Sequence, residues 1–141
     1  MKSTIIQIKK LIILIAVLIS PNAISVDFNI SSNSFADYSV YISNNPVLAD
    51  VSVYISDSPF ADQSVYIKEG NCIFSGTSIN LSTSPYSNVS VYVSNNPVLA
   101  DVSVYLNNNP PLADHSLCVP SGSSQSEIRK YVVAFVAILV N

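Results

Sequence analysis

The sequence predicts an all-β fold made of tandem strand–turn units, each 12–14 residues long. The first observation is a pair of near-identical segments, SVYISNNPVLADV at residues 39–51 and SVYVSNNPVLADV at residues 90–102. The second is that the same pattern, in more divergent form, fills most of the chain. A short repeat is typical of a supersecondary unit that cannot bury its own apolar face and stacks on its neighbours. We therefore predict one compact β domain of stacked units, with a β-solenoid as the alternative arrangement.

The units can be counted from the apolar residue that precedes the aromatic position. These anchors are Val26, Val40, Val53, Val65, Ile79, Val91, Val104 and Leu117. They lie 12–14 residues apart, so seven units lead into an eighth strand. The divergent stretch 68–88 keeps this spacing, which indicates a diverged unit and not an inserted domain.

Each unit begins with a strand and ends with a turn. In residues 51–55, Val and Ile alternate with Ser and Tyr, the period-two pattern of a half-buried strand. Proline then stops the strand, because it has no N–H to donate to a sheet. The apolar residue after the proline is predicted to be a second buried anchor, at Phe35, Leu48, Phe60, Leu99 and Leu112. The aspartate that follows is predicted to cap the turn by accepting backbone N–H groups, at Asp37, Asp50, Asp62, Asp101 and Asp114.

The first 25 residues follow the pattern of a secretory signal. Lysines precede an apolar run at residues 11–19, and Ala23 and Ser25 provide small residues for cleavage after Ser25. The alternative is a retained membrane anchor, but the run is shorter than the roughly 20 residues that span a bilayer. We predict an exported protein with a signal at 1–25, a seven-unit β-repeat domain at 26–120 and a capped apolar segment at 121–141.

The charge of the mature chain argues against nucleic-acid binding. After the signal is removed, Lys68, Arg129 and Lys130 remain against nine acidic residues, which gives a net charge of 3 − 9 = −6. Nucleic-acid affinity rests on neutralising phosphates with a basic surface. An acidic chain without a basic patch lacks that surface.

The C-terminal segment admits two structures. Ser124 and Glu127 fit a capping box, which favours a helix, whereas the many β-branched residues after them favour a strand. We predict a short helix, because the run exceeds ordinary strand length. Residues 131–140 are apolar on all sides, which indicates burial on both sides or contact with a partner or a membrane surface.

Candidate chemistry is sparse. Cys72 and Cys118 are the two cysteines, and in an exported chain they either form a disulfide or remain separate buried thiols. His115 and Cys118 are three residues apart on a predicted strand, so they point to opposite faces and do not form a nucleophile–base pair. The repeated aspartates predict similar environments, unlike the distinct ones that paired catalytic carboxylates need. We predict no catalytic, cofactor or metal site, and keep a secreted enzyme using Lys68, Glu69 and Cys72 in the irregular unit 68–76 as the alternative.

A row of tyrosines is the candidate binding face. These residues recur on the strand face opposite the valine anchors, at Tyr41, Tyr54, Tyr66, Tyr92 and Tyr105. If neighbouring units pair in register, their rings form a ladder that could bind a glycan or another protein. The alternative is cross-strand packing without a ligand.

The repeated pattern resembles that of the septoil-knot domain family, small proteins of unknown function. The resemblance rests on Val-Tyr at 40–41, 53–54, 91–92 and 104–105, and on Ala-Asp at 49–50, 61–62, 100–101 and 113–114. It covers about residues 26–120 and implies a compact β structure threaded as a torus knot, without catalytic residues. From the sequence we therefore expect an exported, non-enzymatic β-repeat domain with a structural or interaction role.

Overall fold

The computed structural model describes residues 28–70, 72 and 76–141, so the predicted signal segment and the anchor Val26 lie outside the described residues. Eight strands, one 3-10 helix and one α-helix make up the described chain. The strands are β1 (Phe28–Ile30), β2 (Tyr38–Ile42), β3 (Val51–Ser56), β4 (Gln63–Glu69), β5 (Thr77–Ser82), β6 (Val89–Val93), β7 (Val102–Leu106) and β8 (His115–Val119). The helices are η1 (Pro110–Leu112) and α2 (Gln125–Val140).

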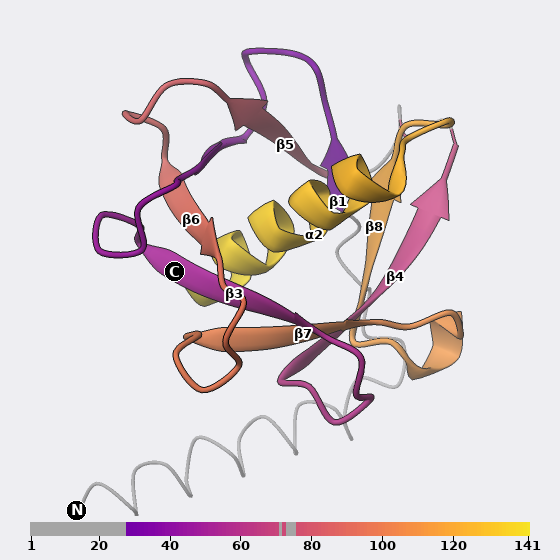
Figure 1. Ribbon diagram of the computed structural model, residues 1–141. Coiled ribbons are helices and arrows are strands. Elements are labelled where there is room, and N and C mark those ends of the chain that lie inside the picture. Colours follow the sequence, from indigo (N-terminus) through magenta and orange to yellow (C-terminus); the bar gives the residue numbers. More distant parts are fainter. Residues whose placement is uncertain (1–27, 71, 73–75) are drawn as a thin grey trace, which may run out of the picture.

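The eight strands form a closed barrel in which every pairing is parallel. Their order around the barrel is β1-β5-β2-β6-β3-β7-β4-β8. Two strands that follow each other in sequence therefore have one other strand between them, except β4 and β5, which have β8 and β1 between them. Figure 1 shows this ring of strands with α2 passing through it.

The predicted fold class is corrected by this topology. Strands dominate, as an all-β prediction requires, but the units do not stack on their sequence neighbours as a solenoid or as a knotted stack of tandem repeats. Strands β2, β3 and β4 pair instead with the strands three and four further along the chain, for example β2 with β5 and β6, and β1 pairs with β5 and β8. The sequence period determines where strands begin, whereas the partner is chosen by packing between residues far apart in the chain.

The six described connections between strands, all except that between β4 and β5, cross over the outside of the strand that separates the two they join. At the start of the β2–β3 loop, Ser43 N donates to Val91 O of β6 (2.8 Å), and at its end Asp50 N donates to Ser90 O (3.0 Å). The β6–β7 loop straddles β3 in the same way, with Ser94 N bonded to Val53 O. Parallel strands ordinarily need a crossover of a dozen or more residues. Here a short loop suffices, because the next strand begins beside the point where the previous one ended.

The barrel interior is filled by the valine anchors and by α2. The described anchors are fully buried: Val40, Val53, Val65, Ile79, Val91, Val104 and Leu117, which confirms the predicted burial of the strand faces. In α2 the consecutive residues from Val132 to Ala137 are all fully buried. Six successive residues cover every side of a helix, so α2 is surrounded by the barrel. Phe135 of α2 packs against Phe28 of β1, with 4.7 Å between the ring centroids.

The stagger of the strands makes room for this helix. Eight-stranded barrels commonly enclose side chains alone, but a larger stagger tilts the strands and widens the barrel. When the register is followed once around the barrel, it returns to β1 about 14 residues from its starting point. A large shift of this kind explains why the interior accommodates α2.

The helix begins at the predicted capping box. Ser124 Oγ accepts the N–H of Glu127 (3.1 Å), and the Glu127 carboxylate accepts the N–H of Ser124 (3.3 Å). The Ser124 hydroxyl also donates to the Glu127 carboxylate (2.9 Å), and this bond, together with that from the Ser124 N–H, holds the pKa of Glu127 below its usual value. Beyond Ala137 the helix is less covered, and Val140 is exposed. No helix in the described ranges is long and apolar enough to cross a membrane.

Candidate functional site: the belt of crossing loops

A repeated side-chain pair fixes six of the loops to the strands that they cross. In the clearest example, Asp101 Oδ2 accepts from both Ser52 N (2.8 Å) and Ser52 Oγ (3.1 Å). In return, Ser52 Oγ accepts the N–H of Asp101 at 2.9 Å. We call this reciprocal arrangement the Asx–Ser clamp. It joins the end of a loop to the strand beneath it.

The described residues contain six such clamps. They are Asp37–Ser78, Asp50–Ser90, Asp62–Ser103, Asn88–Ser39, Asp101–Ser52 and Asp114–Ser64. The aspartates that the sequence assigned to turn-capping therefore bond the backbone of a strand some 40–50 residues away. In Asp37, the bonds from the Ser78 N–H and hydroxyl hold the pKa of the carboxyl below its usual value.

The serine half of the clamp was missed in the sequence, although a signal for it exists. In every clamp the serine directly precedes the valine or isoleucine anchor of its strand, as Ser52 precedes Val53. A recurrent Asp three residues before an anchor and a recurrent Ser one residue before it could have been read as a pair. What the sequence lacks is the information that the two partners belong to different units.

Hydrogen bonds between residues of the same loop also fix the loop conformations. Asn45 Oδ1 accepts the N–H of Val47 and Asn96 Oδ1 accepts that of Val98, each at 3.0 Å. Ser43 Oγ accepts the N–H of Asn45 at 3.1 Å. Such short-range bonds stabilise turns. Together with the clamps, they give the surface loops a defined conformation.

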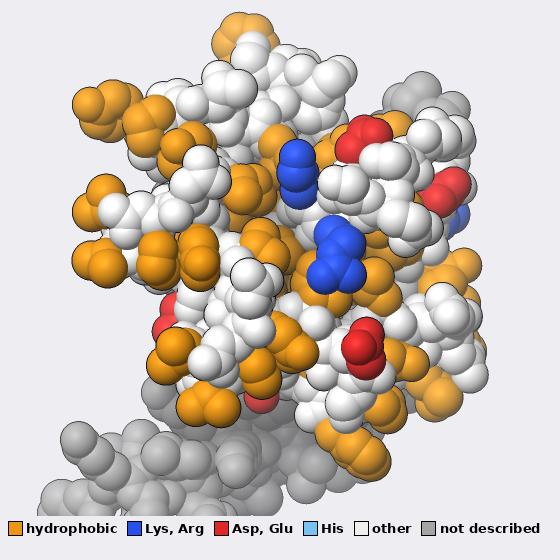
Figure 2. Space-filling view, in the orientation of Figure 1, with side chains coloured by type: hydrophobic (Ala, Val, Ile, Leu, Met, Phe, Trp, Pro, Cys, Tyr) orange, Lys and Arg blue, Asp and Glu red, His pale blue; other side chains and the backbone are white. Residues whose placement is uncertain are grey.

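The apolar residues of the loops point away from the barrel, so the prediction that they are buried anchors is wrong. Their side chains are between 70% and 95% exposed, at Phe35, Leu48, Phe60, Leu99 and Leu112. Val47 and Val98 in the same loops, and Tyr86 in the β5–β6 loop, are also exposed. Figure 2 shows hydrophobic groups projecting at the edge of the molecule over the loops that lie at the left of Figure 1. Because each loop crosses outside a strand, its apolar residue lies too far from the core to reach it.

The tyrosine row is half-buried on the outer face of the barrel. Each tyrosine lies directly opposite a serine of a neighbouring strand: Tyr41 opposite Ser90, Tyr92 opposite Ser52, Tyr54 opposite Ser103, Tyr105 opposite Ser64 and Tyr66 opposite Ser116. The rings thus alternate with serines around the barrel and do not face one another as a ladder. Serines and crossing loops separate the tyrosines into individual surface positions.

Three of these tyrosines line surface hollows: Tyr66 lines one of about 230 Å³ beside the start of α2, and Tyr41 and Tyr92 line two larger grooves. The first groove, of about 390 Å³, is lined by Tyr41, Ser43, Asn44, Asn45, Leu48, Pro85 and Ser90. The second, of about 400 Å³, is lined by Pro46, Ser52, Tyr92, Ser94, Asn95, Asn96, Leu99 and Asp101. These volumes fall within the range of small-ligand sites.

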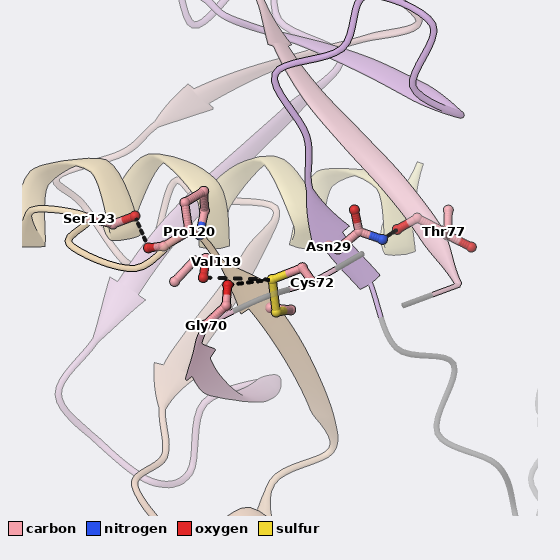
Figure 3. The surroundings of a disulfide bond; sticks show 8 residues. Asn29, Gly70, Cys72, Thr77, Val119, Pro120 and Ser123 are labelled. Atoms are coloured by element: carbon pink, nitrogen blue, oxygen red, sulfur yellow. Dashed lines mark hydrogen bonds between the residues drawn. A yellow bond between two sulfur atoms is a disulfide. The ribbon is translucent and has the colours of Figure 1, made fainter. Parts of the chain in front are cut away.

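The irregular unit is held by a disulfide between Cys72 and Cys118, with the Cα atoms 5.8 Å apart. Figure 3 shows Cys72 beside Gly70, Val119 and Pro120. Gly70 has a φ of +151°, a conformation that glycine adopts most readily, at the point where the chain leaves β4. Because Cys72 is oxidised, it offers no thiolate. Lys68 and Glu69 are exposed on β4, and Glu69 lines a different depression from Cys72.

His115 faces the barrel interior. Its ring lies edge-on to Phe135, 5.6 Å between centroids, and its Nε2 lies 3.0 Å from Gln63 Oε1. Burial lowers the pKa of His115, and the charge of Asp114 partly opposes that shift. Cys118 points outward to its disulfide partner, so the two residues occupy opposite strand faces.

Among residues 28–70, 72 and 76–141, no group of three or more His, Cys, Asp or Glu side chains could hold a metal ion. No protein-family model matches the chain, and no curated protein matches it.

Proposed function

We propose that this protein is an exported, non-enzymatic interaction module that binds its partner, a protein or a glycan, through the belt of crossing loops. The observation that carries this proposal is the exposure of large apolar side chains in successive loops of similar design. Apolar groups that cluster on a protein surface commonly mark an interaction site, and Figure 2 shows such groups gathered at one edge of the molecule.

The order of the loops supports the same proposal. Loops that move freely lose conformational entropy when they bind, which weakens the complex. In this protein the Asx–Ser clamps hold each loop end on a strand before any partner arrives. Preorganised loops on a rigid barrel are a common way to present binding residues.

Export is supported by the disulfide. Disulfides form and persist in oxidising compartments, and the Cys72–Cys118 bond closes a separation of 46 residues. The basic and apolar pattern of residues 1–25 predicts cleavage after Ser25. Expression of the full chain should therefore yield an extracytoplasmic product whose N-terminus, measured by mass spectrometry, is near Val26. A soluble cytoplasmic product that still bears Met1 would contradict export.

The binding role is tested with the exported product as bait against envelope or host extracts. A variant with Leu48→Ser, Phe60→Ser and Leu99→Ser should fold with an unchanged melting temperature and capture much less of the bound material. The matched control, Asp57→Ala, lies in the same belt, is exposed and changes no large apolar side chain. Equal capture by the triple variant and the wild type would show that the loops are not the binding surface.

A further inference from the structure

We infer that the two tyrosine grooves form one paired site for a neutral carbohydrate chain. The inference rests on the proposed interaction function and gives it a ligand class. It starts from the finding that the two most similar segments of the sequence, residues 39–51 and 90–102, build two equivalent grooves.

The two grooves are equivalent position by position. Tyr41, Asn44 and Leu48 of the first correspond to Tyr92, Asn95 and Leu99 of the second. In each, the far wall is a proline from a different loop, Pro85 in the first groove and Pro46 in the second. The two similar segments therefore form two grooves with equivalent linings.

The grooves also lie next to each other. Residues 44–48 of the β2–β3 loop form a wall of the first groove through Asn44, Asn45 and Leu48. The same loop contributes Pro46 to the second groove. One loop is thus the ridge between them, and β2 and β6, which carry the two tyrosines, are paired neighbours in the barrel. A single extended ligand can follow both grooves across this ridge.

The lining fits a sugar ring. A pyranose presents an apolar C–H face that packs on an aromatic ring, and hydroxyl groups at its edge that need hydrogen-bond donors and acceptors. The grooves supply a tyrosine ring and a leucine for the first, and asparagine amides for the second. The Asn44 and Asn95 side chains hold no hydrogen bond to any described residue. Their amides are therefore available to a ligand.

The charges in the grooves indicate a neutral ligand. The first groove has no charged side chain in its lining. The second has one, Asp101, whose Oδ2 already accepts two hydrogen bonds from Ser52. Neither groove has a lysine or an arginine for an anionic sugar or a phosphate.

The next unit provides a matched control within the chain. Tyr54 occupies the same strand position as Tyr41 and Tyr92, but its loop has Asp57 and Ser58 where the others have two asparagines. Loop closure does not require the asparagine pair, since the Asp62–Ser103 clamp forms in this unit as well. A Tyr54→Ser variant therefore removes an equivalent ring from a unit of different chemistry.

The experiment measures binding of the exported protein to neutral hexasaccharides, namely cellohexaose, chitohexaose, xylohexaose, mannohexaose and maltohexaose. Side-chain amide NMR and calorimetry are used, with each probe at up to about 10 mM. We expect at least one probe to shift the amides of Asn44 and Asn95. The hexasaccharide should bind roughly tenfold more tightly than its trisaccharide, because it reaches both grooves.

The variants separate the grooves. Tyr41→Ser or Tyr92→Ser should reduce hexasaccharide affinity to roughly that of the trisaccharide, about tenfold, and the double variant should lose binding. Tyr41→Phe retains the ring and should retain binding. Tyr54→Ser should bind as the wild type does. Tyr41→Ser, Tyr92→Ser and Tyr54→Ser should lower the melting temperature by similar amounts and still unfold in one cooperative transition, which shows that the fold is intact.

Three results would overturn the inference: no amide shift with any of the five probes, equal loss of binding in Tyr54→Ser, or equal affinity for an anionic hexasaccharide such as hexagalacturonate. If the sugars fail while the Leu48, Phe60 and Leu99 variant still loses its captured partner, the interaction module stands and the carbohydrate site does not. If both fail, the belt of loops is not a binding surface.

Discussion

The inner face of the barrel and its outer belt of loops both carry apolar residues, which are buried on the inner face and exposed in the loops. In most units the strand carries a valine or isoleucine anchor, and the loop carries an apolar residue after its proline. The strand residue, such as Val91, is fully buried, whereas the loop residue, such as Phe60, is 95% exposed. The difference teaches that hydrophobicity alone does not decide burial in this repeat. The path of the chain, which crosses outside a neighbouring strand, decides it.

The largest expected effect comes from placing the same charge in both layers. Val91→Asp should unfold the protein, because an unpaired buried charge costs several kcal/mol against a total stability of roughly 5–15 kcal/mol. Phe60→Asp should change stability by no more than about 0.5 kcal/mol. Circular dichroism melting of the two variants measures the contrast. If Val91→Asp melts within a few degrees of the wild type, the assignment of the inner face is wrong.

The contribution of α2 to the inner layer is tested at Phe135. Truncation of this buried ring to alanine should cost about 3–5 kcal/mol, because it removes the contacts with Phe28 and His115 and leaves a cavity. Urea unfolding gives the value. Val140→Ala, near the exposed end of the same helix, is the control and should cost less than about 0.5 kcal/mol. Similar costs at the two positions would mean that the helix does not fill the barrel.

The clamps join the two layers and should contribute less. Asp101→Ala removes the acceptor of two hydrogen bonds from Ser52 and should destabilise the protein by about 1–2 kcal/mol. Asp101→Asn should cost clearly less, because Asn88 fills the same role in the clamp with Ser39. Asp57→Ala, at an exposed loop position, serves as the urea-unfolding control. A loss as large in Asp101→Asn as in Asp101→Ala would show that charge, and not the acceptor oxygen, matters.

The smallest expected effect is a pH dependence from His115. Burial lowers its folded-state pKa below the usual value of 6.5, so the unfolded chain binds the proton more readily than the folded one. Stability is therefore complete above pH 6.5 and declines as the pH falls from 6.5 through the folded pKa. His115→Gln should remove this decline between about pH 7.5 and 5.5 in thermal melts. A decline of equal size in the variant would assign it to another group.

Local features of the fold could be predicted from the sequence, because their signals lie within one unit. Alternating Val and Tyr identified the strands and their buried faces, and Ser124 with Glu127 identified the start of α2. Pairing could not be predicted in the same way. Nothing in the near-identical units distinguishes β5 and β6 from β1 and β3 as partners of β2. The closed barrel follows from those long-range choices.

The candidate site could likewise be predicted only in part, because its walls come from residues far apart in the sequence. The tyrosines and aspartates were visible as recurring residues, but the groove around Tyr92 takes one wall from Pro46, far away in sequence. The exposure of Phe60 and Leu99 could not be read from a pattern in which an apolar residue recurs as regularly as the valine anchors do. Only the crossing of the loops outside the strands separates the two classes.

The alternation of strands around the barrel has a consequence for how the protein folds. β1 to β4 never pair with one another, because each lies between members of β5 to β8. The first half of the chain therefore has no strand partner until the second half has been made, and the core is complete only when α2 enters it. Native contacts of such high sequence separation predict slow folding. The chain should stay unfolded throughout synthesis, which is the state in which a polypeptide can be threaded through a narrow export channel.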